Sequence, residues 1–263
     1  MQYVLVTGAN GGMGKTAVAA LKNAGFFVFA LDKTACEPQH NVFPIQADIT
    51  DEDSVKSAFH AVSAITQELF AIVHFAGIYT LHSLVEIPEQ KFRQAFDVNV
   101  FGAFCINKIF LPLLKKGSRI VLTTSELAPL APLPFTGVYA VTKSALDKYA
   151  YSLRMEVQLL EISVSVLRPG AVQTEMLNVS TAALDDFCEN TALYSCNAKR
   201  FKKIVESVEA RNIPPEKVAQ KTLRILQAKR PKYVYKINRN PLLLLLNILP
   251  QHMQTWIIKQ VLK

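Results

Sequence analysis

Apolar runs of strand length alternate with amphipathic segments of helix length from the first residues of the chain onward. This alternation is typical of a parallel sheet whose strands are joined by crossover helices, and it restricts the chain to α/β architectures. We predict a doubly wound parallel sheet with helices on both faces. The expected strands are 3–6, 26–31, 42–46, 70–75, 119–123, 163–167 and 233–236, and the expected helices are 13–23, 51–65, 88–114, 138–160, 199–210 and 215–228.

Two segments fall outside this alternation. Residues 171–198 are polar and irregular, and residues 241–263 form a leucine-rich tail that carries lysines. No repeat, linker or charge block divides the remainder, and 263 residues of which 50% are hydrophobic can bury one large core. We therefore expect a single domain over residues 1–240, followed by an apolar, basic C-terminal tail over 241–263.

The charge and the cysteines narrow the range of partners. The net charge of +8 is concentrated late in the chain, at 199–203 and 217–239, without interleaved aromatic residues. This pattern favours a solvated or membrane-facing surface, and we expect no nucleic acid as a partner. The four cysteines lack metal-ligand spacing, so we expect reduced thiols and no metal site. The N-terminus enters a strand without a signal-peptide pattern, which favours a cytoplasmic protein, with membrane association through the tail as an open alternative.

A glycine-rich loop follows the first expected strand. The stretch TGANGGMG, Thr7 to Gly14, lies between a strand and a helix, where glycines close a tight turn and let backbone amides approach a pyrophosphate. The loop is not a P-loop, because Ala9 stands where that motif needs its first glycine. A purely structural turn is the alternative. In a Rossmann-type fold, we predict dinucleotide contacts from Gly8, Asn10, Gly12, Met13 and Gly14.

Asp32 stands at the end of the second expected strand, eighteen positions after Gly14. A carboxylate here accepts a hydrogen bond from the adenosine ribose and repels a 2′-phosphate, which favours NAD(H) over NADP(H). Lys33 beside it weakens this inference, since a cation accommodates that phosphate. Asp32 as the cap of a turn is a further alternative.

Tyr139 and Lys143 in YAVTK are one helical turn apart, so both side chains leave the same helix face. A nearby ammonium favours the phenolate and is expected to lower the pKa of Tyr139 toward the working pH. The tyrosine then serves as a general acid or base. Taken alone, the pattern also fits an exposed helix surface.

Further motifs surround this pair. Asp48 stands in ADIT, Asn99 in NVFG and Ser125 in IVLTTS, and RPG spans Arg168 to Gly170 with Thr174 after it. In this order and spacing the chain resembles the short-chain dehydrogenase/reductase family over nearly its whole length, to about residue 240. It is more loosely similar to members that act on steroid, retinoid or other lipid alcohols.

The resemblance implies a role for each matching residue. Tyr139 would donate or accept the proton, and Ser125 would bind the substrate oxygen. Lys143 would hold the nicotinamide ribose, and Asn99 would bind a relay water. Each residue taken alone also has an alternative structural role: Asn99 could fill a helix kink, Ser125 could be a hydroxyl at a strand end, and Thr174 could be an N-cap. Further cofactor contacts are implied for Asp48, Ile49, Ala76, Gly77, Tyr139, Lys143, Pro169, Gly170 and Thr174.

The chain also departs from the family pattern. Phe75 in HFAG replaces the usual asparagine, so a hydrogen bond that supports the sheet or the adenine side is expected to be lost. Ser125 and Tyr139 are about one position farther apart than expected, and Thr124 offers a second hydroxyl. For His74 and His82 we favour core or loop roles.

The substrate side is apolar. The segment between Ser125 and Tyr139 is rich in proline and poor in polar groups, which predicts a rigid, hydrophobic wall. Residues 171–198 are expected to form a lid, with a solvent-exposed insertion as the alternative. The tail is too interrupted to span a bilayer and fits an interfacial helix, or equally a segment packed on the protein or in a subunit interface. The apolar residues singled out in the lid are Met176, Leu177, Leu184 and Phe187.

These observations predict an enzyme that uses NAD(P) to interconvert a secondary alcohol and a ketone on a hydrophobic, steroid-, retinoid- or lipid-like molecule. The alternative is a non-catalytic dinucleotide-binding regulatory or scaffold protein whose tail contacts a membrane surface. The resemblance also implies a homo-oligomer formed through the long helices that hold Asn99 and Tyr139.

Overall fold

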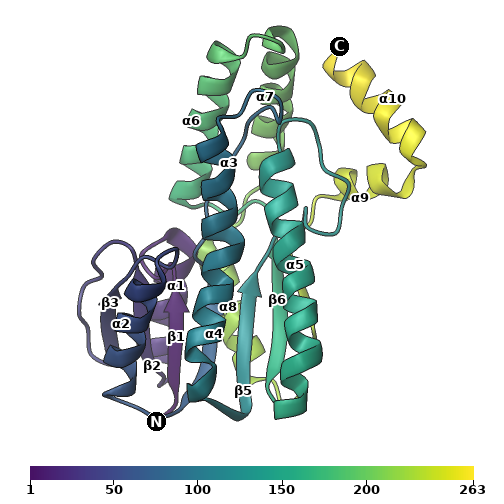
Figure 1. Cartoon of the computed structure of the whole chain (residues 1–263). Helices are drawn as coiled ribbons and strands as arrows, with labels where there is room; N and C mark the ends of the chain where they lie inside the picture. Colours follow the sequence, from purple (N-terminus) through teal and green to yellow (C-terminus); the bar gives the residue numbers. More distant parts are fainter.

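The structure is a computed structural model that describes the backbone of all 263 residues, and the side chains of residues 1–175, 182–207 and 210–263. Met176 and Leu177, which are expected in the lid, lie outside the described side chains. One parallel sheet carries helices on both faces, and further helices extend beyond one end of it (Figure 1).

The sheet has seven strands, and every neighbouring pair is parallel. The order β3-β2-β1-β4-β5-β6-β7 confirms the predicted doubly wound topology. The order reverses between β1 and β4, and the crevice beside the carboxyl ends at such a reversal is where these sheets bind ligands. The strands are β1 (Tyr3–Thr7), β2 (Phe27–Asp32), β3 (Val42–Gln46), β4 (Leu69–His74), β5 (Leu114–Thr123), β6 (Ser163–Pro169) and β7 (Val234–Ile237).

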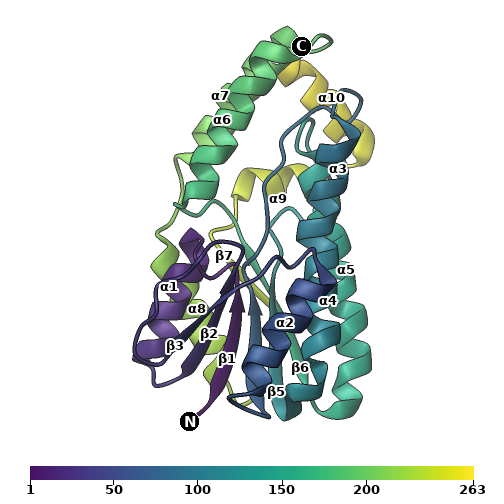
Figure 2. The same ribbon diagram turned by 60° about the vertical axis from the view of Figure 1, so that its left-hand side comes forward.

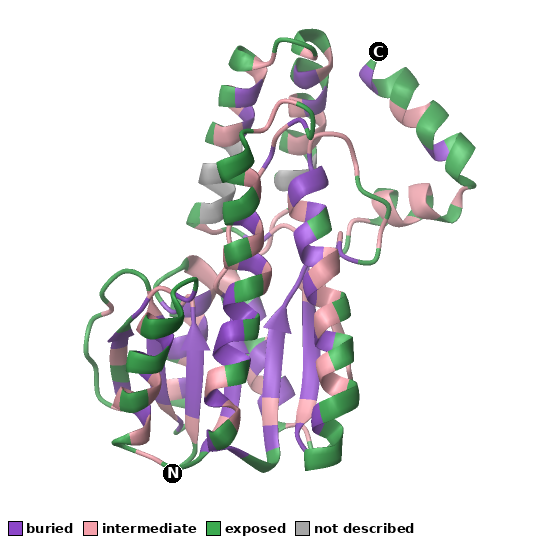
Figure 3. Cartoon of the chain, in the orientation of Figure 1, coloured by how far each residue is buried: buried purple, intermediate pink, exposed green. Residues whose placement is uncertain are grey.

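Alternate side chains of the central strand β1 enter two different cores. Leu5 belongs to the core that is covered by α2 (Glu52–Ser63), α4 (Gly102–Phe110) and α5 (Gly137–Val157). Val4 and Val6 belong to the core that is covered by α1 (Gly12–Asn23) and α8 (Pro215–Gln227). Both faces of β1 are covered, and the strand is buried along most of its length (Figure 3). Its sequence is therefore a continuous apolar run and does not alternate between apolar and polar residues.

The helix expected over 88–114 is interrupted in its middle. It consists of α3 (Glu89–Phe96), a π-helical turn at Asp97–Phe101, α4, and a 3₁₀ turn at Leu111–Leu113. By length and composition the stretch Glu89–Leu113 is apolar enough to cross a membrane. Ile106 and Phe110 are nevertheless fully buried against the sheet, so this stretch is a core helix of the fold.

The expectation that 171–198 is irregular is wrong. This range contains α6 (Glu175–Asn190), and α7 (Ser195–Glu209) begins within it. The two helices form a hairpin beyond the carboxyl end of the sheet (Figure 2). Leu184 and Phe187 of α6 pack with Ala198 and Phe201 of α7. Each helix therefore buries its apolar side chains against the facing one.

The tail forms two helices, α9 (Pro241–Ile248) and α10 (Gln251–Leu262), which meet at Pro250. The end of α10 is attached to the hairpin, because the Asn197 side-chain amide donates to the Leu262 carbonyl at 2.6 Å. Leu262 is also buried in the hairpin core. The tail therefore runs from the sheet to the tip of the hairpin and packs on the protein, which is one of the arrangements expected for it (Figure 2).

Candidate active site

The loop between β1 and α1 is shaped by its glycines. Gly8 has a φ of +66°, and a Cβ there would lie 2.5 Å from the Ala76 nitrogen. A Cβ on Gly14 would lie 1.9 Å from the Gly8 carbonyl oxygen, and one on Gly12 would lie 2.7 Å from Thr174. Among the described side chains none caps the N-terminus of α1, and its first turn contains no acidic residue. The uncapped amides at this helix N-terminus fit a dinucleotide pyrophosphate.

Asp32 is held against this loop. Its Oδ2 accepts from the Asn10 backbone amide at 2.9 Å, and its Oδ1 accepts from the amide and the hydroxyl of Thr34, each at 3.0 Å. Asp32 therefore does cap a turn, in agreement with the alternative interpretation. The same hydrogen bonds fix its carboxylate beside the glycine loop, at the end of β2, where a ribose hydroxyl would bind.

Lys33 is paired with Asp48. Its Nζ lies 2.7 Å from Asp48 Oδ2. The hydrogen bond from Lys33 lowers the pKa of the Asp48 carboxyl to about 2, against an opposing effect of burial. Ile49, predicted as a cofactor contact, places its side chain in the core against Gly102.

Three segments bring the predicted catalytic residues together. Tyr139 and Lys143 lie on α5, Ser125 follows β5, and Asn99 lies in the π-helical turn. Ser125 hydrogen-bonds to the Tyr139 phenol. A Cβ on Gly77 would lie 3.1 Å from Asn99 Oδ1 and 3.2 Å from Lys143 Nζ, so both polar groups converge on this glycine.

Asn99 is fixed by three hydrogen bonds. Its Oδ1 accepts from the Ile78 amide at 2.8 Å. Its Nδ2 donates to the Ile78 carbonyl at 2.9 Å and to Thr142 Oγ1 at 3.0 Å. π-Helical turns are frequent at functional sites, and this one aims Asn99 at the loop after β4. The side chain thus connects that loop to α5, and it does more than fill a kink.

The electrostatics of Tyr139 and Lys143 differ from the expectation. Burial raises the pKa of Tyr139 to about 12, and the Ser125 hydrogen bond opposes this shift. Burial also lowers the pKa of Lys143 to about 8, and Lys143 Nζ donates to the Thr123 carbonyl at 3.2 Å. The predicted lowering of the Tyr139 pKa by Lys143 is wrong for the protein alone, because desolvation of the phenolate dominates. Tyr139 therefore keeps its proton at neutral pH.

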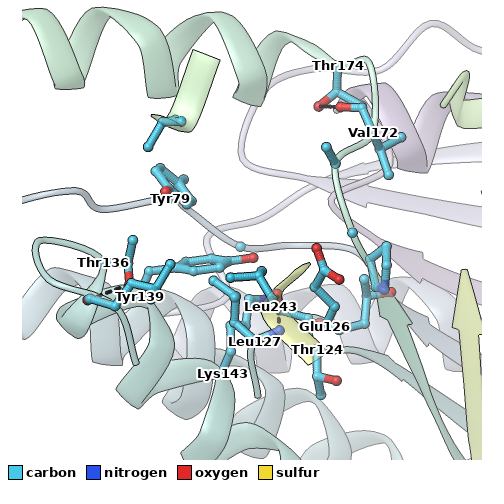
Figure 4. Close-up of a pocket in the computed structure, with 18 of the residues that line it drawn as sticks. Tyr79, Thr124, Glu126, Leu127, Thr136, Tyr139, Lys143, Val172, Thr174 and Leu243 are labelled. Atoms are coloured by element: carbon cyan, nitrogen blue, oxygen red, sulfur yellow. Dashed lines mark hydrogen bonds between the residues drawn. The ribbon is translucent and has the colours of Figure 1, made fainter. Parts of the chain in front are cut away.

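An apolar cavity of about 210 Å³ lies beside Tyr139. In Figure 4 the phenol points into this cavity, and Tyr79 lies near it. The rings of Tyr79 and Tyr139 are 4.6 Å apart between centroids. The cavity has the hydrophobic wall expected before α5, and it has further walls from α7 and the tail. The apolar side chains of these three walls include Leu127, Leu133, Phe201, Ile204, Val205 and Leu243.

Of the apolar residues singled out for the lid, Leu184 and Phe187 do not line the cavity, whereas Ala171, Val172 and Thr174 at the start of the expected lid range do. Leu184 and Phe187 are buried between α6 and α7, whereas Phe201 and the helix turn after it line the cavity. Two further lining residues, Glu126 and Leu243, are not among the sequence-based candidates. Glu126 directly follows Ser125, which is a usable signal, but only the folded tail brings Leu243 to the site.

The other predicted positions gather at the same edge of the sheet. Ala76 packs against Gly8. The two candidate histidines have structural contacts, as expected. His74 Nε2 lies 3.0 Å from Asn107 Oδ1 and burial lowers the His74 pKa to about 4, and the His82 ring packs on Phe187. The predicted cofactor contacts that line the cavity are Met13, Gly77, Tyr139, Lys143, Pro169, Gly170 and Thr174.

Phe75 stands where the family has asparagine, and its backbone pairs with that of Thr7. Within the described side chains, Thr7 Oγ1 is buried without a hydrogen-bond partner. The backbone pairing is intact, because the Phe75 amide donates to the Thr7 carbonyl at 3.0 Å.

The reversed strand order, the glycine loop and the tyrosine and lysine of α5 define the class of dinucleotide-binding oxidoreductases. Comparison with known proteins makes the assignment specific. A family model described as short chain dehydrogenase matches residues 2–185, and the chain belongs to this family.

Relatives agree with this assignment, and a solved structure shares the fold. The "Probable short-chain type dehydrogenase/reductase VdlC" of Helicobacter pylori is 26% identical, over 94% of this chain and 92% of its own length. Mouse estradiol 17-beta-dehydrogenase 2 is 34% identical over 66% of this chain, and the match spans 49% of that protein. A short chain dehydrogenase family protein from Francisella tularensis has a TM-score of 0.75 at 24% identity, over 90% of this chain and 97% of its own.

Proposed function

We propose that the protein uses a nicotinamide dinucleotide to interconvert a secondary alcohol and a ketone on a hydrophobic small molecule. The observation that carries this proposal is the Tyr139 phenol, which is hydrogen-bonded by Ser125 and faces an apolar cavity. Two relatives whose names contain a steroid or a sphingolipid precursor support this proposal. They are estradiol 17-beta-dehydrogenase 2 and a 3-ketodihydrosphingosine reductase of Bacteroides thetaiotaomicron, the latter 24% identical over 90% of this chain and 87% of its own.

A nicotinamide dinucleotide, which the glycine loop and Asp32 would hold, would supply the hydride to the carbonyl carbon or accept it from the carbinol carbon. In the direction of reduction, the Tyr139 hydroxyl donates its proton to the substrate oxygen, and the Ser125 hydroxyl orients that oxygen. Lys143 is buried nearby with a pKa of about 8, so it is mostly charged at neutral pH. Its charge stabilises the phenolate that Tyr139 becomes after giving up the proton.

Substitution of the phenol tests this mechanism. Tyr139→Phe removes the proton donor and keeps the ring, so turnover of a hydrophobic ketone should fall by roughly 100-fold or more, while NADH binding, followed by fluorescence, stays nearly unchanged. Thr124→Ala is the matched variant, because its lost hydroxyl contacts Asp147 at 3.2 Å and not the phenol, and it should keep most of the turnover. Full turnover by Tyr139→Phe would contradict the mechanism and favour the non-catalytic alternative.

For the cofactor we propose NAD(H) in preference to NADP(H). The Asp32 carboxylate is fixed beside the glycine loop, where it would repel a 2′-phosphate. Lys33, the cation that would offset this repulsion, is engaged by Asp48. The proposal therefore requires that Asp32 faces the ribose while Lys33 stays paired with Asp48.

Two neighbouring variants separate those roles. Asp32→Ser removes the charge, so the ratio of the NADPH to the NADH dissociation constant should fall by roughly 10-fold or more in fluorescence titrations. Lys33→Met is the matched variant next to it and should change the ratio little, because Lys33 is paired with Asp48. Tighter binding of NADPH than NADH by the wild-type protein would refute the proposed preference.

We also propose that the protein is a cytoplasmic homo-oligomer whose tail contacts membrane surfaces. The uncovered apolar side chains of the π-helical turn, α4, α5 and the tail support these two contacts, among them Phe101, Phe104, Ile248 and Trp256. Their separate locations allow each contact to be tested without the other.

A further inference from the structure

A carboxylate lies in the wall of the apolar cavity. Among the cavity-lining residues whose side chains are described, Glu126 is the only one with a carboxylate. Glu126 is 9% exposed, and burial raises its pKa. A carboxylate in such surroundings is costly unless its oxygens accept hydrogen bonds. Its partners therefore decide what the cavity can bind.

The protein satisfies one of the two carboxylate oxygens. Oε2 accepts from the Asn240 backbone amide at 2.7 Å, at the residue before α9. The Glu126 amide donates to the Pro169 carbonyl at 2.9 Å, which fixes its backbone as well. Oε1 accepts no hydrogen bond from any residue that the structure describes. The carboxylate is thus held in one orientation, and its Oε1 can still accept a hydrogen bond.

The free oxygen lies beside a residue that leaves space for it. Oε1 would be 2.9 Å from a Cβ on Gly170, so the missing side chain of this glycine gives the carboxylate its room. The positive charge of Arg239 opposes the rise in the Glu126 pKa that burial causes. In the close-up, the Glu126 carboxylate and the Tyr139 hydroxyl both point toward the middle of the cavity, from different walls (Figure 4).

We infer that Glu126 is a specificity-determining residue whose Oε1 accepts a hydrogen bond from a hydroxyl or ammonium group on the substrate. The inference rests on the proposed function and adds a requirement to it. Leu127, Leu133 and the other walls accept any apolar chain of suitable size, but a buried acceptor rejects a substrate that leaves it unpaired. The substrate is therefore a hydrophobic ketone or alcohol that carries a second, donor group.

The test compares matched ketones. Parent long-chain ketones are assayed beside their α-, β- and γ-hydroxy and amino derivatives, with wild type, Glu126→Gln and Glu126→Leu. We expect the wild type to favour at least one hydroxy or amino derivative over its parent by roughly 10- to 100-fold in kcat/KM. Glu126→Leu should abolish this preference. Glu126→Gln keeps an acceptor oxygen without charge, so it should retain the preference for a hydroxyl and lose that for an ammonium.

A control separates substrate recognition from the anchoring of the tail. Asn240→Pro removes the amide that binds Oε2 and keeps Glu126, and the φ of −78° at Asn240 is compatible with proline. This variant should preserve the preference, and a loss of preference equal to that in Glu126→Leu would show that the tail is responsible. Equal kcat/KM for parent and derivatives in the wild type overturns the inference alone. Absence of turnover with every ketone overturns the proposed function instead.

Discussion

At the scale of single residues, the sequence indicates which residues gather at the site, and the fold decides their surroundings. The spacing of Tyr139 and Lys143 predicts one shared face, and both lie on α5 as expected. The predicted direction of the Tyr139 pKa shift is wrong, because it depends on how far the fold removes the phenol from water. The surroundings of Glu126 escape prediction for the same reason, since its neighbours Gly170 and Asn240 are distant in sequence.

The buried Lys143 makes stability depend on pH. Burial lowers the Lys143 pKa from 10.5 to about 8, so between these pH values the unfolded chain binds more protons than the folded one. The contribution of Lys143 to stability must then rise with pH across this window, by up to about 1.4 kcal/mol per pH unit. Above pH 10 the raised pKa of Tyr139 acts in the opposite direction, because there the unfolded chain ionises before the folded one.

The measurement is urea unfolding of the protein without cofactor between about pH 7 and 9.5. The free energy of unfolding of wild type minus that of Lys143→Met should increase with pH, because the variant lacks the titrating group. Taking the difference removes the contributions of other groups, such as Cys36 and Cys105, whose pKa values are raised by burial. A difference that is independent of pH would show that Lys143 is not desolvated.

At the scale of elements, the strands are the most predictable part of the fold. β3 has the predicted bounds of 42–46, and the other strands begin or end within a few residues of expectation except β5, which begins at Leu114. Strands buried on both faces form continuous apolar runs, and such runs are a local signal in the sequence. α6 and the π-helical turn are not predictable in this way, because α6 depends on α7 and the turn on the contacts of Asn99.

The tail has an inner and an outer face. α9 and α10 pack inward through Leu243 and Leu262, yet Leu245, Ile248 and Trp256 remain exposed, Ile248 to 79%. Residues 241–263 contain lysines and no acidic residue. For the proposed membrane contact we expect this outward face to bind anionic lipid surfaces. The full chain should co-float with phosphatidylserine vesicles, and the triple substitution Leu245→Gln, Ile248→Gln and Trp256→Gln should reduce the bound fraction severalfold.

A matched surface residue controls for general hydrophobicity. Leu159 is exposed in the 3₁₀ turn after α5, at the end of that helix far from the tail (Figure 1). Leu159→Gln should float like wild type. Flotation of the triple variant at the wild-type level would contradict the proposed membrane contact. The tail would then serve only to line the cavity, which Leu243 already does.

At the scale of the whole molecule, the π-helical turn, α4 and α5 leave an aromatic and apolar surface uncovered. Phe101 is 57% exposed, its ring lies 5.4 Å from that of Phe104, and the Phe104 ring lies 6.4 Å from that of Tyr149 on α5. The same turn and helix carry Asn99 and Tyr139. The proposed homo-oligomer would place a second copy of the chain on this surface, which would brace the active-site elements from outside.

If a second copy covers this surface, substitutions in it should lower both the mass of the particle in solution and its thermal stability. Phe101→Asp with Phe104→Asp should shift the sedimentation coefficient to that of a monomer, because charged side chains would be buried without partners at the interface. The wild-type midpoint of thermal unfolding should rise with protein concentration, and that of the variant should not. Tyr151→Asp on another side of α5, where Tyr151 packs on Tyr233, is the control and should sediment like wild type. A wild-type protein that sediments as a monomer would mean that Phe101 and Phe104 are exposed to solvent and that the active site is braced from within, through Asn99 and Thr142.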